Sequence, residues 1–508
     1  MLSAGSRRWW ALAAISLAIL AITLDITVLM LALPTLAGAL KASESELQRF
    51  VSAYTLALVA GMLPAGLIGD RYGQRTVMSA SLVLFALASA GCAFAPNPAL
   101  FIVARVLVAV AGAMIIVVAL SAVTVLFAPE ERPRAIGIWS AANFLGMPLG
   151  PILGGWILAH FFWGWIFLMN VPVALVALLA VLALVPARGE RSRTRVDGLG
   201  LVAASLGLTA LMYGIIEAGS RGWLSPHATV PAAGGLLVLV AFWALERRVG
   251  RTGGTPVVDF DVFRSPSFTW GVVLSALGSL GLFGVLFALP QFMQAIQGIG
   301  VQGTGLRLLP AIVGLIVGAL PADRVAGRLG AKLTVAGGFA VAVAGSLWGA
   351  TLTTGSSTLF LATWTFIVGA GAGLGFATAA SVAVVELPAE SSGVGSALLQ
   401  AVIKLGPAIG SSVLGSVLSS AYQSRLALSG LPRAAAAAAR SSVFAGLAVA
   451  HELGSQALLQ SVRSAFTSGL ASALVAAAAV FAGALILVLL FLPARRARAA
   501  GQAGAAQD

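Results

Sequence analysis

The chain has 508 residues, of which 59% are apolar and only 9% are charged, and its mean hydropathy is +1.00. Soluble domains carry about 25% charged residues, so this composition excludes a soluble globular protein and indicates that lipid surrounds most of the chain. The net charge of +13 is not gathered on one tail, because basic residues recur in short clusters between apolar runs, as at Arg7-Arg8 and Arg188 to Arg195. This is the positive-inside pattern of a multi-pass membrane protein and not a nucleic-acid-binding surface.

The apolar runs predict an all-α integral membrane protein with fourteen spanning helices, because a helix needs roughly 20 mostly apolar residues to cross the hydrocarbon layer. An even number of spans, with basic residues before the first and after the last, places both termini in the cytoplasm. The predicted spans are 9–38, 47–69, 77–95, 98–127, 135–159, 164–186, 197–217, 228–249, 267–297, 303–325, 334–353, 356–384, 392–418 and 469–492.

A weak internal repeat organises these spans. The run Gly69 to Arg75 after the second span is echoed by Ala326 to Lys332 after the tenth. Many secondary transporters are built from such repeats, with the substrate site at the repeat interface. The predicted parts are a six-helix bundle at 1–196, two extra membrane helices and a cytoplasmic linker at 197–266, a second six-helix bundle at 267–492, and a cytoplasmic tail at 493–508. Within the second bundle, the Ala-rich segment 419–468 predicts an extracytoplasmic hairpin of two short helices, with a flexible loop as the alternative.

Asp25 is the most informative residue of the first span, since no other charge lies near it in the apolar run. An acid at the centre of a bilayer costs about 2.5–3.5 kcal/mol even on the lenient scale, so such residues are functional by default. We therefore expect Asp25 to take part in proton or substrate binding. An acid that is paired only to fix helix packing is the structural alternative.

Three further motifs carry chemistry. A glycine-rich turn with an acid and two arginines follows the second span, and Arg105 stands alone inside the fourth, where a buried arginine must find a carboxylate or carbonyl groups. The fifth span concentrates glycines that let helix backbones touch around a proline that bends the helix. The residues of the turn are Gly66, Asp70, Arg71, Gly73 and Arg75, and those of the fifth span are Gly146, Gly150, Pro151, Gly154 and Gly155.

Together these motifs resemble the major facilitator superfamily, in its fourteen-span drug/proton antiporter branch and closest to the QacA/SmvA-like multidrug exporters. The resemblance implies the major facilitator fold, with two six-helix halves plus two extra central helices. It also implies that the turn around Asp70 is a gating motif, that Arg105 takes part in proton coupling, and that the fifth span carries the antiporter motif.

The sequence departs from this branch at Lys404, which lies in the thirteenth predicted span, where several relatives carry an acid. Lys404 could pair with Asp25 or receive an anionic or zwitterionic substrate. Asp323, beside Arg324 and Arg328, is expected to form a salt bridge that closes an inner gate, with substrate binding as the alternative. The candidate coupling residues are therefore Asp25, Arg105, Lys404 and Asp323, and the candidate cavity residues are Tyr54, Met62, Phe144, Met147, Phe283, Phe287 and Gln400.

The function expected from these features is proton-coupled export of amphipathic drugs, dyes or antiseptics, with lipophilic cations favoured, across a bacterial inner membrane. A dedicated exporter of one antibiotic or natural product and a solute importer stay open as alternatives. The chain has no Gly-Lys dipeptide and hence no phosphate-binding loop for an ATP-driven pump. It shows no metal-ligand spacing and no Gly-x-Ser-x-Gly motif, so we expect no enzyme activity, no metal and no cofactor, and we expect a monomer.

Overall fold

The computed structural model describes residues 4–185, 198–251, 260–385, 387, 392–428 and 431–493, and within these ranges the chain is helical and contains no strand. Helices suit the predicted environment, because hydrocarbon offers no hydrogen bonds and a spanning segment must satisfy its backbone internally. Residues 186–197, residues 252–259 within the predicted linker region, and the predicted tail after residue 493 lie outside the described residues.

The N-terminal half contains the first seven helices. Their bounds are α1 Ala4–Ala39, α2 Glu44–Tyr72, α3 Gln74–Ala93, α4 Pro98–Leu126, α5 Arg132–His160, α6 Trp165–Leu168 and α7 Asn170–Leu184. Turn chemistry explains where several of them begin. The Ser43 hydroxyl accepts a hydrogen bond from the Glu46 N–H while Glu46 bonds back to Ser43, and Asn97 accepts from the Leu100 N–H ahead of α4. Such side chains satisfy the free N–H groups of a helix start.

The extra pair and the C-terminal half follow. Their bounds are α8 Gly198–Arg221, α9 Pro226–Arg251, the 3-10 turn η1 Phe260–Arg264, α10 Pro266–Ala295, α11 Val301–Arg307, α12 Leu309–Ala319, α13 Ala322–Leu329, α14 Ala331–Gly349, α15 Thr358–Val385, α16 Ser392–Arg425, α17 Arg433–Ser441, α18 Val443–Glu452 and α19 Gln456–Phe491. The predicted repeat is visible at two turns, since Gly73 between α2 and α3 has φ 86° and Gly330 between α13 and α14 has φ 82°. Both backbones lie where only glycine is relaxed.

The number of spans is lower than predicted in the part of the chain that is described. Twelve helices there are long and apolar enough to cross a membrane, or thirteen if Gly303–Ala319 and Ala322–Leu329, which meet at a bend of 46°, form one span. Helix α5 is not among the twelve. The predicted count of fourteen is therefore not confirmed.

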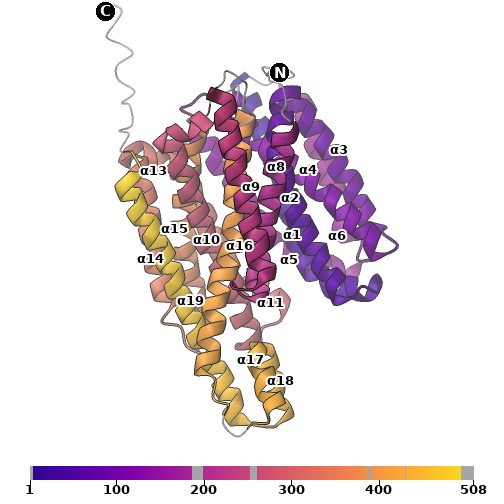
Figure 1. Cartoon of the computed structure of the whole chain (residues 1–508), viewed down its shortest axis with the longest axis vertical. Coiled ribbons are helices and arrows are strands. Elements are labelled where there is room, and N and C mark those ends of the chain that lie inside the picture. Colours follow the sequence, from indigo (N-terminus) through magenta and orange to yellow (C-terminus); the bar gives the residue numbers. More distant parts are fainter. Residues whose placement is uncertain are drawn as a thin grey trace, which may run out of the picture.

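The two halves meet along α2 with α16 on one side and α5 with α12 and α15 on the other. Helix α8 packs on its partner α9, on α2 and on α16, so it closes the seam between the halves. Figure 1 shows α8 and α9 running side by side along this seam.

The predicted hairpin at 419–468 is only partly a separate element. Its two short helices are α17 and α18, but α16 continues to Arg425 and α19 already begins at Gln456. The Tyr422 hydroxyl donates a hydrogen bond to the Ala439 carbonyl at 2.8 Å and fastens α17 to α16. Figure 1 shows α17 and α18 projecting at the end of the molecule opposite to α13.

The halves are fastened together where α2 ends and α16 begins. The Asp70 carboxylate accepts hydrogen bonds from the backbone N–H groups of Gly393 at 2.8 Å and Val394 at 3.1 Å. A carboxylate at a helix start also meets the positive end of the helix dipole. The helices approach so closely that a Cβ placed on Gly66 would lie 2.5 Å from the Gly393 carbonyl oxygen. We call these contacts of Gly66 and Asp70 with Gly393 and Val394 the α2–α16 lock.

Among the described residues, the contacts of the basic residues of the predicted gating motif stay within the N-terminal half. The Arg71 guanidinium lies over the ring of the adjacent Tyr72, 5.6 Å from its centroid, and Arg75 donates to the Leu182 carbonyl at 2.5 Å. The link between the halves in this motif is therefore made by Asp70.

Replacing Asp70 by Asn should weaken the α2–α16 lock, because a neutral amide keeps one acceptor but loses the charge-assisted bonds. The expected loss is about 1.5 kcal/mol, or about tenfold in the ratio of closed to open molecules. Spin labels at the exposed positions Tyr72 and Leu329, in a Cys92→Ala background, should show a longer distance population by double electron–electron resonance.

The control for this measurement is Asp323→Asn, because the Asp323 carboxylate has no ion pair within the described ranges. The control should leave the distance distribution unchanged. An Asp70→Asn distribution identical to that of the control would show that Asp70 does not hold this end closed.

Candidate functional site

A central cavity of about 760 Å³ lies between the halves, within the range of sites for drug-sized ligands. It is lined by residues of α1, α2, α5, α10, α15 and α16, and also by Met212 and Ile216 of α8. Most of the wall is apolar. Its polar side chains are Thr23, Thr27, Ser52, Tyr54, Thr55, Asn143, Ser279, Gln400, Lys404 and Ser411.

The cavity extends away from the α2–α16 lock. Its lining residues on α2 lie between Leu47 and Val59, in the first half of that helix, and Leu33 near the end of α1 joins them. At 1.5 Å per residue, Leu47 is about 35 Å along the helix from Asp70. The structure is thus closed at the lock and hollow toward the opposite end.

The predicted cavity residues divide into two groups. Tyr54, Phe144, Phe283 and Gln400 line the cavity. Met62 and Phe287 do not: Met62 is fully buried, next to Gly61, where a Cβ would lie 3.0 Å from Ala113 Cβ of α4, and Phe287 is 46% exposed. Met62 lies three residues beyond Val59 and Phe287 four residues beyond Phe283, the last lining residues of their helices, and residue type alone did not show which positions reach the cavity. The side chain of Met147 lies outside the described residues.

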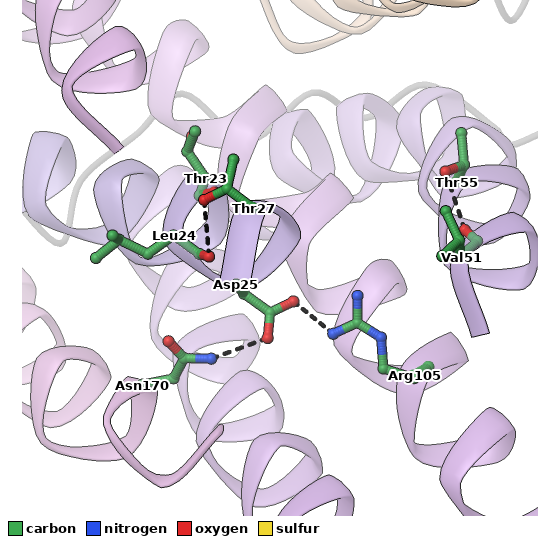
Figure 2. A network of polar contacts seen from close by, with 8 residues as sticks. All are labelled: Thr23, Leu24, Asp25, Thr27, Val51, Thr55, Arg105 and Asn170. Atoms are coloured by element: carbon green, nitrogen blue, oxygen red, sulfur yellow. Dashed lines mark hydrogen bonds and ion pairs between the residues drawn. The ribbon is translucent and has the colours of Figure 1, made fainter. Parts of the chain in front are cut away.

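Asp25 is held in a buried network formed by three helices. Its Oδ2 lies 2.6 Å from Arg105 Nη1 of α4, and both side chains are 0% exposed. Its Oδ1 accepts a hydrogen bond from Asn170 Nδ2 of α7 at 3.0 Å (Figure 2). A buried ion pair needs its remaining acceptors satisfied to offset desolvation, and Asn170 supplies that bond. Asn170 was missed in the sequence, although an amide inside an apolar span was a usable signal.

Asp25 does not face the central cavity. Figure 2 shows its side chain pointing away from Thr23 and Thr27 of the same helix, which are the residues that line the cavity. The predicted pairing of Asp25 with Lys404 is also wrong, because the carboxylate is taken by Arg105 and Asn170.

Tyr54 stands between the cavity and the ion pair. It lines the cavity, and the Arg105 guanidinium lies over its ring, 4.3 Å from the centroid. A cation over an aromatic face is stabilised by the ring quadrupole. The Tyr54 hydroxyl is buried without a hydrogen-bond partner in the described part of the chain. Tyr54 therefore places one aromatic ring between a ligand in the cavity and the charged pair behind it.

The glycines of the antiporter motif pack α5 directly on the helix that carries Asp25. A Cβ on Gly146 would lie 2.6 Å from Thr23 Cβ, one on Gly150 would overlap Thr27 Oγ1, and one on Gly154 would lie 2.9 Å from Val28 Cγ1. The spacing of four residues puts all three glycines on one face of α5. Gly155 is partly exposed, and the side chain of Pro151 lies outside the described residues.

Helix α5 also contacts the other half. A Cβ on Gly137 would lie 2.8 Å from the Ala319 carbonyl oxygen at the end of α12. Because α5 is packed on the Asp25 segment and on the C-terminal half, a displacement of α1 near Asp25 has a direct mechanical path across the seam.

The other two predicted coupling residues lie apart from Asp25. Lys404 lines the cavity from α16. Asp323 lies on α13 outside the cavity, and the ion pairs of the described residues do not include the salt bridge predicted for it. Those residues also contain no group of three or more His, Cys, Asp or Glu that could hold a metal ion.

Replacing Asn170 by Ala should destabilise the protein by about 1–3 kcal/mol, because it leaves Asp25 Oδ1 buried without a donor. The loss should shrink when Asp25 is already replaced by Asn, so a double-mutant cycle should give a coupling of about 1 kcal/mol or more. Unfolding titrated with sodium dodecyl sulfate measures all four variants.

Asn143→Ala is the matched control, since Asn143 accepts its bond from the neutral Thr23 hydroxyl at 2.8 Å. Its effect should add to that of Asp25→Asn within about 0.5 kcal/mol. Additive effects of Asn170→Ala and Asp25→Asn would refute the role given to Asn170.

Comparisons with known proteins agree with this architecture. A profile of the Major Facilitator Superfamily matches residues 15–411. The chain is 30% identical to the multidrug efflux pump LfrA of Mycolicibacterium smegmatis, over 96% of this chain and 97% of LfrA. It is 32% identical to the tetracenomycin C resistance and export protein of Streptomyces glaucescens, over 84% and 80%, and 30% identical to the methyl viologen resistance protein SmvA of Salmonella typhimurium, over 91% and 93%.

A solved structure supports the same fold. The proton:xylose symporter XylE aligns with a TM-score of 0.63 at 14% identity, over 96% of each chain. The resemblance expected from the motifs is thus confirmed over nearly the whole sequence, and the chain belongs to the major facilitator superfamily.

Proposed function

We propose that this chain is a proton-coupled antiporter that exports amphipathic small molecules across a bacterial cytoplasmic membrane by alternating access, as a monomer with both termini in the cytoplasm and without enzyme activity. The observation that carries the proposal is the buried Asp25–Arg105 pair placed directly behind the cavity wall at Tyr54. The names of the relatives, which include multidrug efflux and antibiotic export, support export of drug-like compounds.

The proton is proposed to act on the ion pair. A proton on Asp25 removes the charge that compensates the buried Arg105 guanidinium, and an uncompensated buried charge is strongly unfavourable. Arg105 then has to move toward other electron-rich groups, and Tyr54 is the nearer of the two rings already in contact with it, the other being Phe167. Because Tyr54 is also part of the cavity wall, a proton on Asp25 and a ligand in the cavity compete for its position.

The change at Asp25 reaches the other half through α5. The three glycines of α5 leave no free space against the α1 segment from Thr23 to Val28, so α1 and α5 move together. The α2–α16 lock then opens while the opposite end closes. The observed state, closed at the lock, is the one that releases substrate and takes up a proton from outside.

The orientation rests on the ends of the chain. Figure 1 shows that α1 begins and α19 ends at the same end of the molecule, where α13 also lies. The basic clusters near both termini favour the cytoplasm for this end. The α2–α16 lock then faces the cytoplasm, and the projecting helices α17 and α18 lie outside.

A dedicated exporter of one natural product is the second candidate. It is favoured by relatives whose names specify one compound, such as the tetracenomycin C resistance and export protein and the puromycin resistance protein pur8 of Streptomyces alboniger. Both candidates share the coupling mechanism and differ only in how many ligands the cavity accepts.

The proposal predicts that Asp25→Asn abolishes coupled transport, since Asn cannot exchange a proton. Inverted vesicles with an acidic interior should take up an amphipathic dye, tested with both ethidium and fluorescein, and a protonophore should collapse the uptake. Asp25→Asn should fall to the level of vesicles without the protein, whereas Asp323→Asn should retain most of the activity.

Two results would refute the mechanism in different ways. Protonophore-sensitive uptake by Asp25→Asn at the wild-type rate would place the coupling acid elsewhere. Dye movement that runs only in the opposite direction, into vesicles of native orientation, would favour the importer.

A further inference from the structure

The charge of the cavity wall is unusual for a site expected to favour cations. Among the described residues that line it, Lys404 is the one with a formal charge, and no Asp or Glu is among them. Asp25 and Arg105 lie behind Tyr54 and neutralise each other. A ligand in the cavity therefore meets one positive charge and no carboxylate.

The Lys404 ammonium has no ion pair and no hydrogen bond within the described residues. It belongs to the middle of α16, which crosses the molecule from Ser392 to Arg425. Ionisable side chains inside a membrane protein almost always pair with one another or with backbone carbonyls. A lysine that lines a cavity without such a partner can pair with an acceptor on a bound ligand.

Gln400 gives a second and independent observation one helical turn earlier. It is 2% exposed, it lines the same cavity, and its Nε2 amide group is buried without an acceptor. Residues four apart share a helix face, so Gln400 and Lys404 present their donors side by side. An ammonium can only donate hydrogen bonds, so what is missing at this place is an acceptor, and a negatively charged one fits best.

The backbone of α16 beside these residues is already satisfied. Pro407 has no N–H, so it leaves the Ile403 carbonyl without its helical donor. The Ser279 hydroxyl of α10 donates to that carbonyl at 3.4 Å. The Gln400 and Lys404 side chains are therefore not needed as hydrogen-bond donors to the Ile403 carbonyl.

We propose that Gln400 and Lys404 form the binding site for an acidic group, so that the preferred substrates are amphipathic organic acids with a carboxylate, sulfonate or phenolate. The apolar body of such a molecule would rest on the aromatic wall, where Phe144 of α5 and Phe376 of α15 meet edge to face at 5.6 Å between centroids. This inference rests on the proposed export function and names its substrate class.

The substrate charge has a consequence for the driving force. Exchange of one proton for a monovalent cation moves no net charge, so the membrane potential does not drive it. Exchange of one proton for a monovalent anion moves two charges inward. Each charge moved through 100 mV changes the attainable ratio of substrate concentrations across the membrane by about 50-fold. The membrane potential therefore acts on two charges in each cycle that exports an acid.

The first experiment measures binding to the purified protein by fluorescence anisotropy, with fluorescein as the aromatic acid and ethidium as the aromatic cation. The wild type should bind fluorescein more tightly than ethidium. Lys404→Gln should weaken fluorescein binding by about tenfold or more, the usual effect of losing a hydrogen bond to a charged group. Lys404→Arg should restore most of it, and Gln400→Glu should weaken it by pairing with Lys404.

Lys332→Gln is the matched control, because Lys332 lies at the start of α14 and outside the cavity. It should bind both dyes like the wild type. Fluorescein affinity that is unchanged in Lys404→Gln, an absence of fluorescein binding to the wild type, or tighter binding of ethidium would each overturn the inference.

The second experiment separates this inference from the proposed function. Fluorescein uptake into inverted vesicles should accelerate when an interior-positive potential is imposed with potassium and valinomycin, and Lys404→Gln should lose that uptake. If fluorescein binding depends on Lys404 but no protonophore-sensitive uptake occurs, the proposed export function is refuted and the proposed binding site is retained. If proton-coupled uptake is unchanged in Lys404→Gln, the proposed export function is retained and the proposed binding site is refuted.

Discussion

The structure depends on one constraint, which is that a carboxylate in the middle of a membrane cannot stay ionised alone. Asp25 meets this constraint with a cation from α4 and an amide from α7, so three helices of the N-terminal half are fixed relative to one another by a single side chain. The pair is stable only while both charges exist. In the proposed mechanism a proton on Asp25 disturbs this arrangement, and Tyr54, which contacts both Arg105 and the cavity, transmits the change to the ligand.

The two ends of the molecule are built on different principles. At the α2–α16 lock, contact is polar and tight, with Asp70 bound to backbone N–H groups and glycines that permit close approach. Toward the other end the halves separate around an apolar cavity with few polar groups. Polar contacts at a closed end can be exchanged for water when that end opens, whereas a large buried apolar contact would hold it shut. Such an end can open and close repeatedly.

Much of the architecture could be predicted from the sequence, because hydrophobic runs and isolated charges are local signals. The approximate positions of most helices, the family, the buried Asp25 and the close packing of the α5 glycines follow from them, whereas the limits of α16 and α19 do not. The side of each helix that faces the cavity could not be predicted, since it depends on how neighbouring helices rotate that helix about its axis. Met62 and Phe287 were placed in the cavity from residue type alone, and the pairing of Asp25 with Lys404 was wrong for the same reason. The contribution of α8 to the cavity wall was missed because its packing between α2 and α16 is a tertiary contact.

Helix α16 combines features that are usually distributed over several elements. Over 34 residues, or about 50 Å, it carries Gly393 of the lock, the donors Gln400 and Lys404, and Tyr422, which is bonded to the projecting α17. These contacts lie on one continuous helix whose hydrogen bonding is interrupted at Pro407, so a tilt of α16 changes several of them together. If a macromolecule bound at the projecting end changes the affinity of the cavity for its ligand, thermodynamic linkage requires that the ligand change the affinity of the protein for that macromolecule by the same factor. Binding at α17 and α18 would in that way be an allosteric input to the cavity.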